Sequence, residues 1–314
     1  MDLRQLASLV AIADHGSFSA AARALYTVQS NVSGHIARLE KELGTVLVDR
    51  AKGGLTDDGV LVVERARKIQ RELDAISSDV RAHDEVAGEA HIGAIATTAR
   101  WLMPQLLREL GTAHPNVRVV LYEGNTTALL PRLLDGNLDA AIIHLPVDDP
   151  ELVVEPLFAE DLVLIATDRH PLGQHDEASL IDVAAFPLLL PPRGTALRRS
   201  IDRAANNVGV ELDALAEIDG VRLLASLAFD GFGPTIIPAT SLPSKVPDGF
   251  RRVRVPELPR RVVGWAHRRR PAPTPPVRMV LELLRESIQS GGAEQVGVHV
   301  GNVSPLLGRS SLAL

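Results

Sequence analysis

The sequence predicts a multidomain chain of mixed class, in which a small all-α region precedes a larger α/β region. Up to about residue 83 the apolar residues recur at spacings of three and four, which is the period of a helix. Beyond residue 90, short apolar and β-branched runs alternate with helical patterns, which indicates a parallel or mixed sheet. A length of 314 residues allows two or three domains.

The composition is typical of a globular protein, with 46% hydrophobic and 23% charged residues. There is no cysteine, which excludes disulfides, thiolate zinc sites and cysteine nucleophiles and permits a reducing compartment. No apolar run reaches the roughly 18 residues of a membrane span. The start, Met1-Asp2-Leu3-Arg4, is not a secretory signal. We therefore expect a cytoplasmic protein without a membrane partner.

Three short helices are predicted for the first 45 residues. The first has apolar residues at spacings of 3, 4 and 3 and ends at His15-Gly16. Ser17 or Ser19 is suited to cap the second helix, because a short hydroxyl side chain accepts an orphan backbone N–H. The third follows from about residue 29. The expected core consists of Leu6, Val10, Phe18, Ala22, Leu25, Val32, Ile36, Leu39 and Leu47.

The third helix begins with polar side chains and few acids. These residues are Gln29, Ser30, Asn31, Ser33, His35 and Arg38. Short hydrogen-bonding side chains at a helix N-terminus suit a DNA major groove, where base edges offer donors and acceptors. The same pattern also fits a helical hairpin whose polar face only meets solvent, and the pattern alone does not separate these two interpretations.

The order of motifs favours the DNA interpretation. G-S-F-S-A-A-A-R-A-L, Q-S-N-V-S-G-H-I-A-R-L-E-K-E-L-G, L-V-D-R and L-T-D-D-G follow one another in about the first 60 residues. This series closely resembles the winged helix-turn-helix of LysR-type transcriptional regulators, which are bacterial. The resemblance implies a domain over residues 1–58 that binds double-stranded DNA. We expect base contacts from Gln29, Ser30, Asn31 and Ser33 and phosphate contacts from Arg38, Arg50 and Lys52.

The sequence departs from the family pattern at a few positions. Leu9 and Val48 stand where the family usually has Phe, and Gly34 stands where the family often has a basic or larger polar residue. The wing, residues 50–55, is about two residues shorter than usual. Residues 1–60 hold six Lys or Arg against seven Asp or Glu, and the whole chain has a formal charge of −6. The usual basic footprint is therefore weak, and we expect modest, salt-sensitive non-specific affinity.

A long helix is predicted from Asp57 to about His83, because this stretch lacks proline and has one glycine near its start. Thr56, Asp57 and Asp58 form a capped acidic first turn. An apolar seam at spacings of 7, 4, 3 and 4 either packs on its own domain or pairs with a second copy. Its residues are Val62, Ile69, Leu73, Ile76 and Val80. By resemblance, residues 59–88 form the linker and dimerisation helix and hinge, in a homotetramer assembled as a dimer of dimers.

The remaining sequence predicts two α/β blocks. Strands are expected at 91–96, 117–123, 138–144, 161–166, 186–190, 212–218, 235–238 and 261–267, and helices at 100–111, 126–135, 197–206, 222–230 and 276–290. G-A-I-A-T-T, W-L-M-P-Q-L-L, Y-E-G, L-L-D-G-N-L-D-A-A-I-I, H-P-L and F-D-G-F-G-P-T-I-I-P resemble the LysR-type effector domain in order.

That second resemblance covers residues 89–290 and implies two lobes like those of periplasmic binding proteins. Lobe I comprises about 89–160 and 262–290, and lobe II about 161–261, with a small molecule in the cleft between them. Residues 291–314 lie outside the resemblance and show little periodicity. We expect them to form a mobile tail with at most a weak strand at 296–300.

Ligands of open α/β folds collect at the carboxyl ends of strands and at helix N-termini. The effector-binding residues expected on this ground are Thr97, Thr98, Asn125, Thr126, His144, Arg193, Thr195 and Gly231. Thr97 and Thr98 have the alternative role of a simple N-cap, and a buried His144 is often structural. Arg193 is suited to pair a carboxylate in bidentate fashion. The set suits a small, polar, anionic metabolite.

Two other classes of protein are weighed against a regulator. An enzyme is disfavoured because the sequence has no G-x-S-x-G, no G-x-x-x-x-G-K-[ST] and no complete G-x-G-x-x-G after a strand. Among ten histidines only His170 and His175 approach a metal spacing, so no metal or cofactor is expected. A solute-binding transport protein is disfavoured because it would not carry the N-terminal DNA-binding segment that this chain has. We expect a ligand-responsive transcription factor on an interrupted palindromic promoter site, with RNA polymerase as a further partner.

Overall fold

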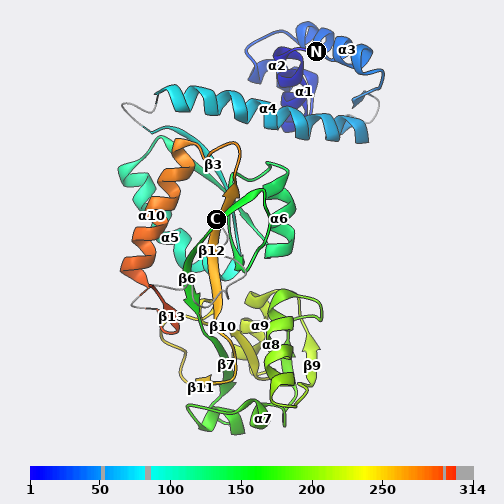
Figure 1. Ribbon diagram of the computed structural model, residues 1–314. Coiled ribbons are helices and arrows are strands. Elements are labelled where there is room, and N and C mark those ends of the chain that lie inside the picture. The colour runs from blue at the N-terminus through cyan, green and yellow to red at the C-terminus, as the bar shows by residue number, and fades with distance from the viewer. Residues whose placement is uncertain (51–53, 82–85, 293–294, 302–314) are drawn as a thin grey trace. The chain divides into compact units, whose positions relative to one another are not determined.

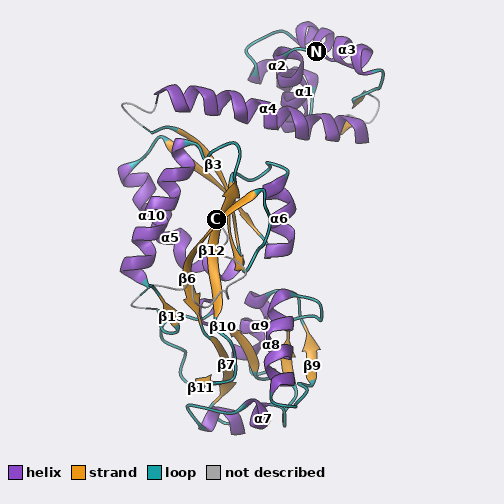
Figure 2. Ribbon diagram, in the orientation of Figure 1, coloured by secondary structure: helices purple, strands orange, loops and turns teal. Residues whose placement is uncertain are grey.

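The structure is a computed structural model that describes residues 1–50, 54–81, 86–292 and 295–301 (Figure 1). It consists of two compact units, Met1–Glu85 and Val86–Leu314. Both units contain helices and strands, and the second holds the two large sheets (Figure 2). Within the described residues, no helix combines the length and the apolarity that crossing a membrane requires.

The first unit is built from four helices and a short two-stranded ribbon. Its elements are α1 (Leu3–His15), α2 (Phe18–Ala24), α3 (Gln29–Leu43), β1 (Val48–Asp49), β2 (Gly54–Leu55) and α4 (Asp57–Arg81). The Ser17 side chain accepts from the backbone N–H of Ala20 and caps α2, so Ser17 is the cap of the two serines that the sequence offered. Gly16 and Gly44 end α1 and α3 in the left-handed conformation that glycine adopts without strain.

The core of the first unit contains most of the expected residues. Val32, Ile36 and Leu39 are fully buried on one stripe of α3, and Leu9 fills the core in place of the usual Phe. The prediction for Leu25 is wrong, because its side chain is 37% exposed. The reason is that α2 ends at Ala24, so Leu25 leaves the helix and no longer follows the buried face.

The second unit contains two mixed sheets, and each belongs to one lobe. Lobe I has the strand order β13-β6-β12-β5-β3-β4, and lobe II has β11-β7-β10-β8-β9. The strands are β3 (Gly88–Ala94), β4 (Val117–Glu123), β5 (Ala140–Leu145), β6 (Leu152–Glu160), β7 (Leu162–Thr167), β8 (Leu188–Leu190), β9 (Ala214–Glu217), β10 (Thr235–Pro238), β11 (Phe250–Arg254), β12 (Arg261–Arg268) and β13 (Val298–His299).

Helices cover both faces of each sheet. They are α5 (Ala96–Ala113), α6 (Thr126–Leu134), α7 (Leu180–Val183), α8 (Ala196–Asn207), α9 (Val221–Phe229), α10 (Pro275–Gly291) and the 3₁₀ turns η1 (Pro171–Gln174) and η2 (Ala239–Ser241). In lobe I, α5 and α10 lie on one face and α6 on the other (Figure 2). In lobe II, Leu162 and Leu164 of β7 pack into the core beneath α7 and α8, whereas Val163 and Ile165 pack with α9. This alternation is the period of a strand.

The chain crosses between the lobes twice, and a buried ion pair joins the two crossings. β6 ends at Glu160 and β12 begins at Arg261, with the Arg261 Nε 2.9 Å from the Glu160 Oε1. The other carboxylate oxygen of Glu160 accepts from the Thr240 backbone N–H at 3.0 Å and hydroxyl at 2.7 Å. Glu160 is therefore held by one residue from the return crossing and one from lobe II.

The sequence patterns miss two strands, β6 and β11. Glu155 and Pro156 interrupt the apolar run of β6, and the pairing with β12 shifts register between Val263 and Gly264, beside Pro156. β11 has three arginines among its five residues and little apolar signal. Both strands form because neighbouring strands supply their hydrogen bonds, and single-sequence patterns do not report such partners.

Residues 295–301, within the expected mobile tail, pack against the rest of the unit, and the weak strand expected at 296–300 is present as β13 (Val298–His299). The buried Gln295 side chain donates to the carbonyls of Ala239 and Leu242 at 3.2 and 3.1 Å and accepts from Ser244. β13 pairs with the end of β6. Gly297 is required for close approach, because a Cβ there would lie 2.8 Å from the Ala239 Cβ. Residues 302–314 lie outside the described residues.

We predict that Gln295→Ala lowers the free energy of unfolding by about 1–3 kcal/mol, because it leaves the carbonyls of Ala239 and Leu242 and the Ser244 hydroxyl without their hydrogen-bond partner. Denaturant unfolding measures this loss. Gln289→Ala, at an exposed position on α10, is the matched control and should change stability little. Equal effects of the two substitutions would contradict the structural role of the 295–301 segment.

Candidate functional site

The N-terminal turn of α3 presents polar side chains to solvent. Gln29, Ser30 and Asn31 are exposed and Ser33 is half-buried, while the opposite stripe of the helix forms the core. No side chain caps this helix, whose N-cap is Val28. The first turn of α3 therefore offers backbone N–H groups together with short polar side chains, which is the chemistry that a phosphate or a base edge meets.

Hydrogen bonds orient two of these side chains. The Ser19 hydroxyl donates to the Gln29 Oε1 at 3.2 Å, and the Asn31 Nδ2 donates to the Thr27 hydroxyl at 3.0 Å. Gln29 is left with its amide N–H groups as donors, and Asn31 with its carbonyl oxygen as an acceptor. His35 has a different role, because its Nδ1 lies 2.8 Å from the Ser8 hydroxyl and ties α3 to α1.

A hollow lies between α3 and the short ribbon. Its lining residues are Ile12, Gly16, Ser17, Phe18, Gln29, Ser33, Val48, Asp49 and Arg50. The Arg50 guanidinium stacks 5.7 Å from the centre of the Phe18 ring and lies 3.8 Å from the Glu40 carboxylate. These contacts keep a cation at the rim of the hollow beside the polar end of α3.

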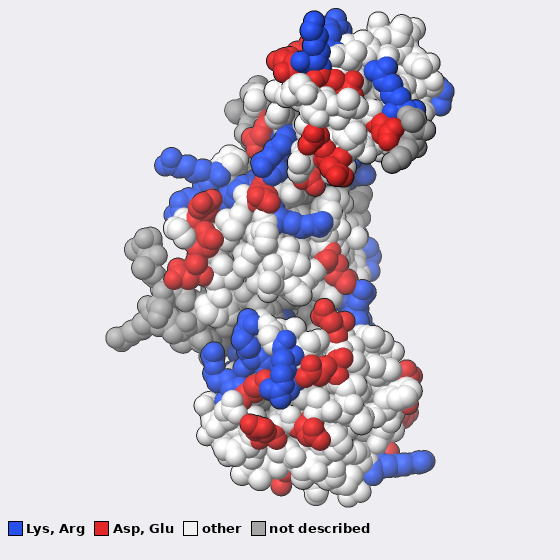
Figure 3. All heavy atoms as spheres, turned by 90° about the vertical axis from the view of Figure 1, so that its right-hand side faces the viewer, with Lys and Arg blue, Asp and Glu red and all other residues white. Residues whose placement is uncertain are grey.

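The positive groups expected to meet phosphates do not form a continuous patch. Arg38 is exposed on α3 and Arg50 is held as described, while Lys52 lies outside the described residues. On the face shown in Figure 3, basic and acidic side chains of this unit are intermixed. Polar, uncharged side chains therefore make up most of the candidate interface.

A second candidate site lies where α5 of lobe I meets η2 of lobe II. Thr97 and Thr98 are buried, and neither hydroxyl has a hydrogen-bond partner among the described residues. Their expected alternative role as N-caps is wrong, because the N-cap is Ile95, whose backbone N–H still bonds to the sheet at Ile142. The chain turns straight from β3 into α5, which places both threonines inside the first turn.

Further buried polar atoms around the lobe junction lack hydrogen-bond partners in the described structure. They include the Ser241 hydroxyl and the His144 Nε2, together with the Glu160 Oε1 and the Arg261 Nε, which face each other as an ion pair without hydrogen-bond geometry. The Arg100 Nη1 donates to the Ser241 carbonyl at 2.6 Å, which joins α5 to η2. An unsatisfied buried polar group costs about 1–3 kcal/mol, so each of these atoms requires a partner such as a bound water or a ligand.

His144 is neutral in this environment. Burial holds the pKa of its imidazole well below the ordinary 6.5, and the charge of Arg261 lowers it further. Burial also lowers the pKa of Arg261 to about 10, although Glu160 opposes that shift. The His144 backbone N–H donates to the Thr126 hydroxyl at 3.0 Å, which couples β5 to the start of α6. His144 can therefore offer a neutral imidazole nitrogen to a ligand.

We predict that the protein loses stability as the pH falls below about 6.5, the ordinary pKa of histidine. Below that pH the imidazole of His144 is protonated in the unfolded chain but stays neutral in the folded protein. The free energy of unfolding therefore decreases as the pH is lowered, until the pH reaches the depressed pKa of the folded state. Denaturant unfolding between pH 7.5 and 5 measures this slope.

His144→Gln should flatten this pH dependence, whatever its effect on stability at pH 7.5. His175→Gln, at an exposed position, is the control and should keep the wild-type slope. The same slope in the wild type and in His144→Gln would contradict the assignment.

The other expected effector residues mostly have structural partners. The Asn125 side chain caps α6 by accepting from the Ala128 N–H at 2.9 Å. Thr195 caps α8, accepting from the Arg198 N–H and donating to the Pro192 carbonyl. Gly231 is exposed at a left-handed turn with φ of +81°. Thr126 accepts from His144, as described.

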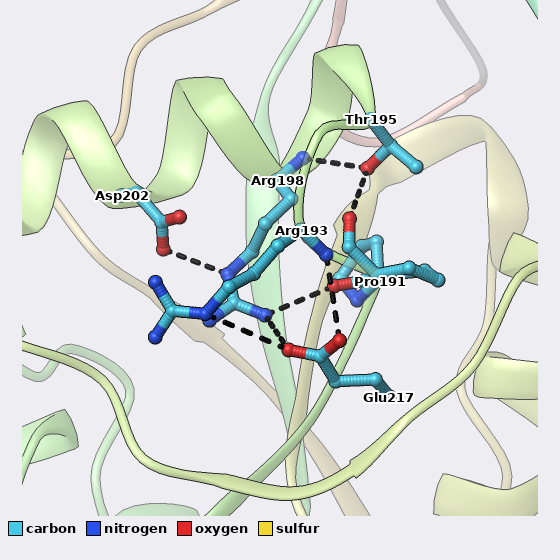
Figure 4. A network of polar contacts seen from close by, with 7 residues as sticks. Pro191, Arg193, Thr195, Arg198, Asp202 and Glu217 are labelled. Carbon is cyan, nitrogen blue, oxygen red and sulfur yellow. Dashed lines mark hydrogen bonds and ion pairs between the residues drawn. The ribbon is translucent and has the colours of Figure 1, made fainter.

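Arg193 lies in a network whose buried cation is another residue. Arg193 is largely exposed, and its Nε lies 3.9 Å from the Glu217 carboxylate. Arg198, 1% exposed, donates to Asp202 at 2.7 Å, to Glu217 at 3.0 Å and to the Pro191 carbonyl at 3.0 Å (Figure 4). The sequence analysis missed Arg198, although the i,i+4 spacing to Asp202 was a signal for an ion pair.

The described contacts do not bring all the expected effector residues together. Thr97 and Thr98 lie at the junction with η2, whereas Arg193 and Thr195 contact groups of their own lobe. The lobes also meet at an exposed ion pair, in which the Arg222 Nη2 of α9 lies 2.8 Å from Glu123 at the end of β4. No group of metal-ligating side chains occurs in the described part of the chain.

Two family models match successive parts of the chain. Residues 3–60 match the family described as "Bacterial regulatory helix-turn-helix protein, lysR family", and residues 83–289 match the "LysR substrate binding domain". The hydrogen peroxide-inducible genes activator of Dickeya chrysanthemi is 30% identical and covers 97% of this chain and 99% of its own length. The DNA-binding transcriptional dual regulator OxyR of Escherichia coli K12 is 31% identical, over 92% and 95%.

Solved structures of full-length regulators are also similar. A full-length OxyR variant from Pseudomonas aeruginosa has 25% identity and a TM-score of 0.68, over 92% of this chain and 95% of that one. Full-length CbnR, in complex with its target DNA, has 25% identity and a TM-score of 0.68, over 91% and 100%.

Proposed function

The chain belongs to the LysR family of DNA-binding transcriptional regulators, and we propose that it reads an interrupted palindromic promoter site under the control of a small polar or anionic effector. It acts as a dimer of dimers in the cytoplasm, is not an enzyme and requires no cofactor. RNA polymerase is the further partner expected at a promoter. The observation that carries the proposal is the exposed, uncapped polar end of α3 on a helix whose other face is fully buried.

The direct test is a mobility-shift titration on the intergenic DNA upstream of the protein's own gene, with unrelated DNA as competitor. A retarded band that survives competitor supports the proposal. Binding that the competitor removes in proportion to its mass would contradict sequence-specific recognition.

We predict different consequences for base and phosphate contacts. Asn31→Ala should cost about 1–3 kcal/mol on the best site and relax sequence choice, because it removes a base-edge acceptor. Arg38→Gln should weaken all sequences alike and lower the salt slope, because it removes a phosphate contact, and Lys52→Ala should behave in the same way. Titrations on matched and mutated sites measure both effects. Equal loss on every sequence for both kinds of variant would contradict this division.

Self-association is proposed through α4. Val62, Ile69 and Ile76 repeat at a spacing of seven, as in a coiled-coil seam. Val62 packs on the core of the first unit, whereas Ile69 and Ile76 are exposed, the latter to 62%. Burying these two side chains requires a partner, and a second α4 presents the same seam.

We predict that Ile76→Glu shifts the protein towards monomer at micromolar concentration, because the paired helices would then carry like charges within an apolar seam. Sedimentation velocity measures the change. Leu61→Glu is the matched control, since Leu61 is 60% exposed on the same helix but off the seam. A wild-type protein that is monomeric at this concentration would contradict the paired-helix arrangement.

The effector is proposed to bind at Thr97 and Thr98. Two unpartnered hydroxyls and the uncapped N-terminus of α5 together suit an anionic or strongly polar group. Several relatives are hydrogen peroxide-inducible genes activators. This chain of 314 residues has no cysteine, so thiol oxidation does not supply its signal. A reversibly bound metabolite fits the site better than an oxidant.

We predict that Thr97→Val leaves the effector-free protein at least as stable, because it removes an unsatisfied buried hydroxyl at constant shape. It should also abolish the thermal stabilisation that an effector gives in a screen of organic anions. Thr127→Val, at an exposed position on α6, should retain that stabilisation. A wild-type response in Thr97→Val would contradict the placement of the site.

A further inference from the structure

Tyr26 has a backbone conformation that a tyrosine rarely adopts. It lies in the turn between α2 and α3 with φ of +51°, and it is the only non-glycine residue with a positive φ in the described part of the chain. This left-handed conformation costs a side-chain-bearing residue roughly 1–2 kcal/mol, and Gly or Asn usually occupies it. The Tyr26 N–H bonds to the Arg23 carbonyl, and the Thr27 N–H bonds to the Ala22 carbonyl. The turn is therefore fixed, and the strain persists in it.

The Tyr26 side chain makes no packing interaction with the described residues that would offset this strain. It is 98% exposed, more than any other large hydrophobic residue that the structure describes. Val28, two residues further on, is also exposed. Neither packing nor backbone preference accounts for a tyrosine here. Strained backbone conformations that no local packing offsets are typical of functional sites.

The place of Tyr26 indicates which partner it serves. It stands three residues before Gln29, and the next residue, Thr27, accepts the hydrogen bond that orients Asn31. A side chain displayed from this turn meets whatever flanks the polar end of α3. When α3 enters a major groove, the flanking surface is the sugar-phosphate backbone.

The charges of the domain supply a second, independent reason. With six basic and seven acidic side chains in residues 1–60, few cations are available to hold phosphates. Neutral donors, tyrosine hydroxyls among them, also bind phosphate oxygens in protein–DNA complexes. The exposed phenol of Tyr26, held on a fixed turn, can supply such a hydrogen bond without adding charge.

We propose that Tyr26 is a further DNA-contact residue, whose hydroxyl donates to a phosphate oxygen beside the groove that α3 reads while its ring packs on the adjoining deoxyribose. The inference rests on the proposed DNA-binding function. It assigns Tyr26 to affinity and positioning, and it leaves the choice of bases to Gln29, Ser30, Asn31 and Ser33.

The test is fluorescence-anisotropy titration of full-length protein on its specific DNA fragment at several salt concentrations. Tyr26→Phe removes only the hydroxyl, and Tyr26→Asn removes the whole side-chain interaction with a residue that tolerates the left-handed turn. Tyr26→Phe should bind several-fold more weakly and Tyr26→Asn about tenfold or more, as expected when a hydrogen bond and its packing are removed. Phe232→Asn removes an exposed aromatic ring from the other unit and should bind as the wild type does.

Two further readouts separate DNA binding by Tyr26 from a structural role. The slope of log affinity against log salt should stay unchanged in both Tyr26 variants, whereas Arg38→Gln should reduce its magnitude by about 0.9 for each phosphate that is no longer neutralised. The melting temperature of Tyr26→Asn should equal or exceed that of the wild type, because the strain is relieved. Weaker binding by a protein that is no less stable supports the inference.

Several results would overturn it. Wild-type affinity in Tyr26→Asn would remove Tyr26 from the interface, and if promoter activation were then abolished, the tyrosine would serve a protein partner instead. Wild-type affinity in Tyr26→Phe alone would overturn the phosphate hydrogen bond. Failure of the wild type itself to bind any specific fragment would contradict the proposed function and this inference with it.

Discussion

The buried pair of Glu160 and Arg261 fixes where the two lobes of the effector unit meet. Glu160 ends β6, where the chain leaves lobe I, and Arg261 begins β12, where the chain returns to it. Thr240 adds two hydrogen bonds from lobe II. Removing one partner of such a pair typically costs about 3–5 kcal/mol, because it leaves an uncompensated buried charge. The same charge of Arg261 helps to keep His144 neutral, and the tail at Val298 pairs with Glu160.

This arrangement sets the chemistry of the lobe junction. Thr240 positions η2, and the neighbouring Ser241 carbonyl accepts from Arg100 of α5, so the first turn of α5 lies against lobe II. Buried hydroxyls of Thr97, Thr98 and Ser241 have no hydrogen-bond partner among the described residues. A ligand that bonds to both lobes would complete them. Its differential affinity for two lobe arrangements is what would change the DNA-binding state.

The elements that local patterns dictate were predictable, and those fixed by distant partners were not. The stripe from Val32 to Leu39, the Ser17 cap and β10 follow from spacing and capping chemistry. β6 depends on β12 across a proline, and residues 295–301 depend on the contacts of Gln295. Arg198 is buried only because Glu217 and Pro191 reach it from elsewhere in the sequence. The polar end of α3 was identified, but the strain at Tyr26 is visible only in the backbone.

The N-terminal unit combines a well-packed helix-turn-helix with few cations, so we expect neutral polar contacts to supply much of its affinity for DNA. Such an interface depends on fit to a particular sequence more than on charge. The most direct test is a selection of binding sites by the full-length protein from sheared genomic DNA at physiological salt. The account predicts enrichment of a few fragments that share an interrupted palindrome. Recovery of fragments with no common motif would contradict it, because α3 would then read no sequence.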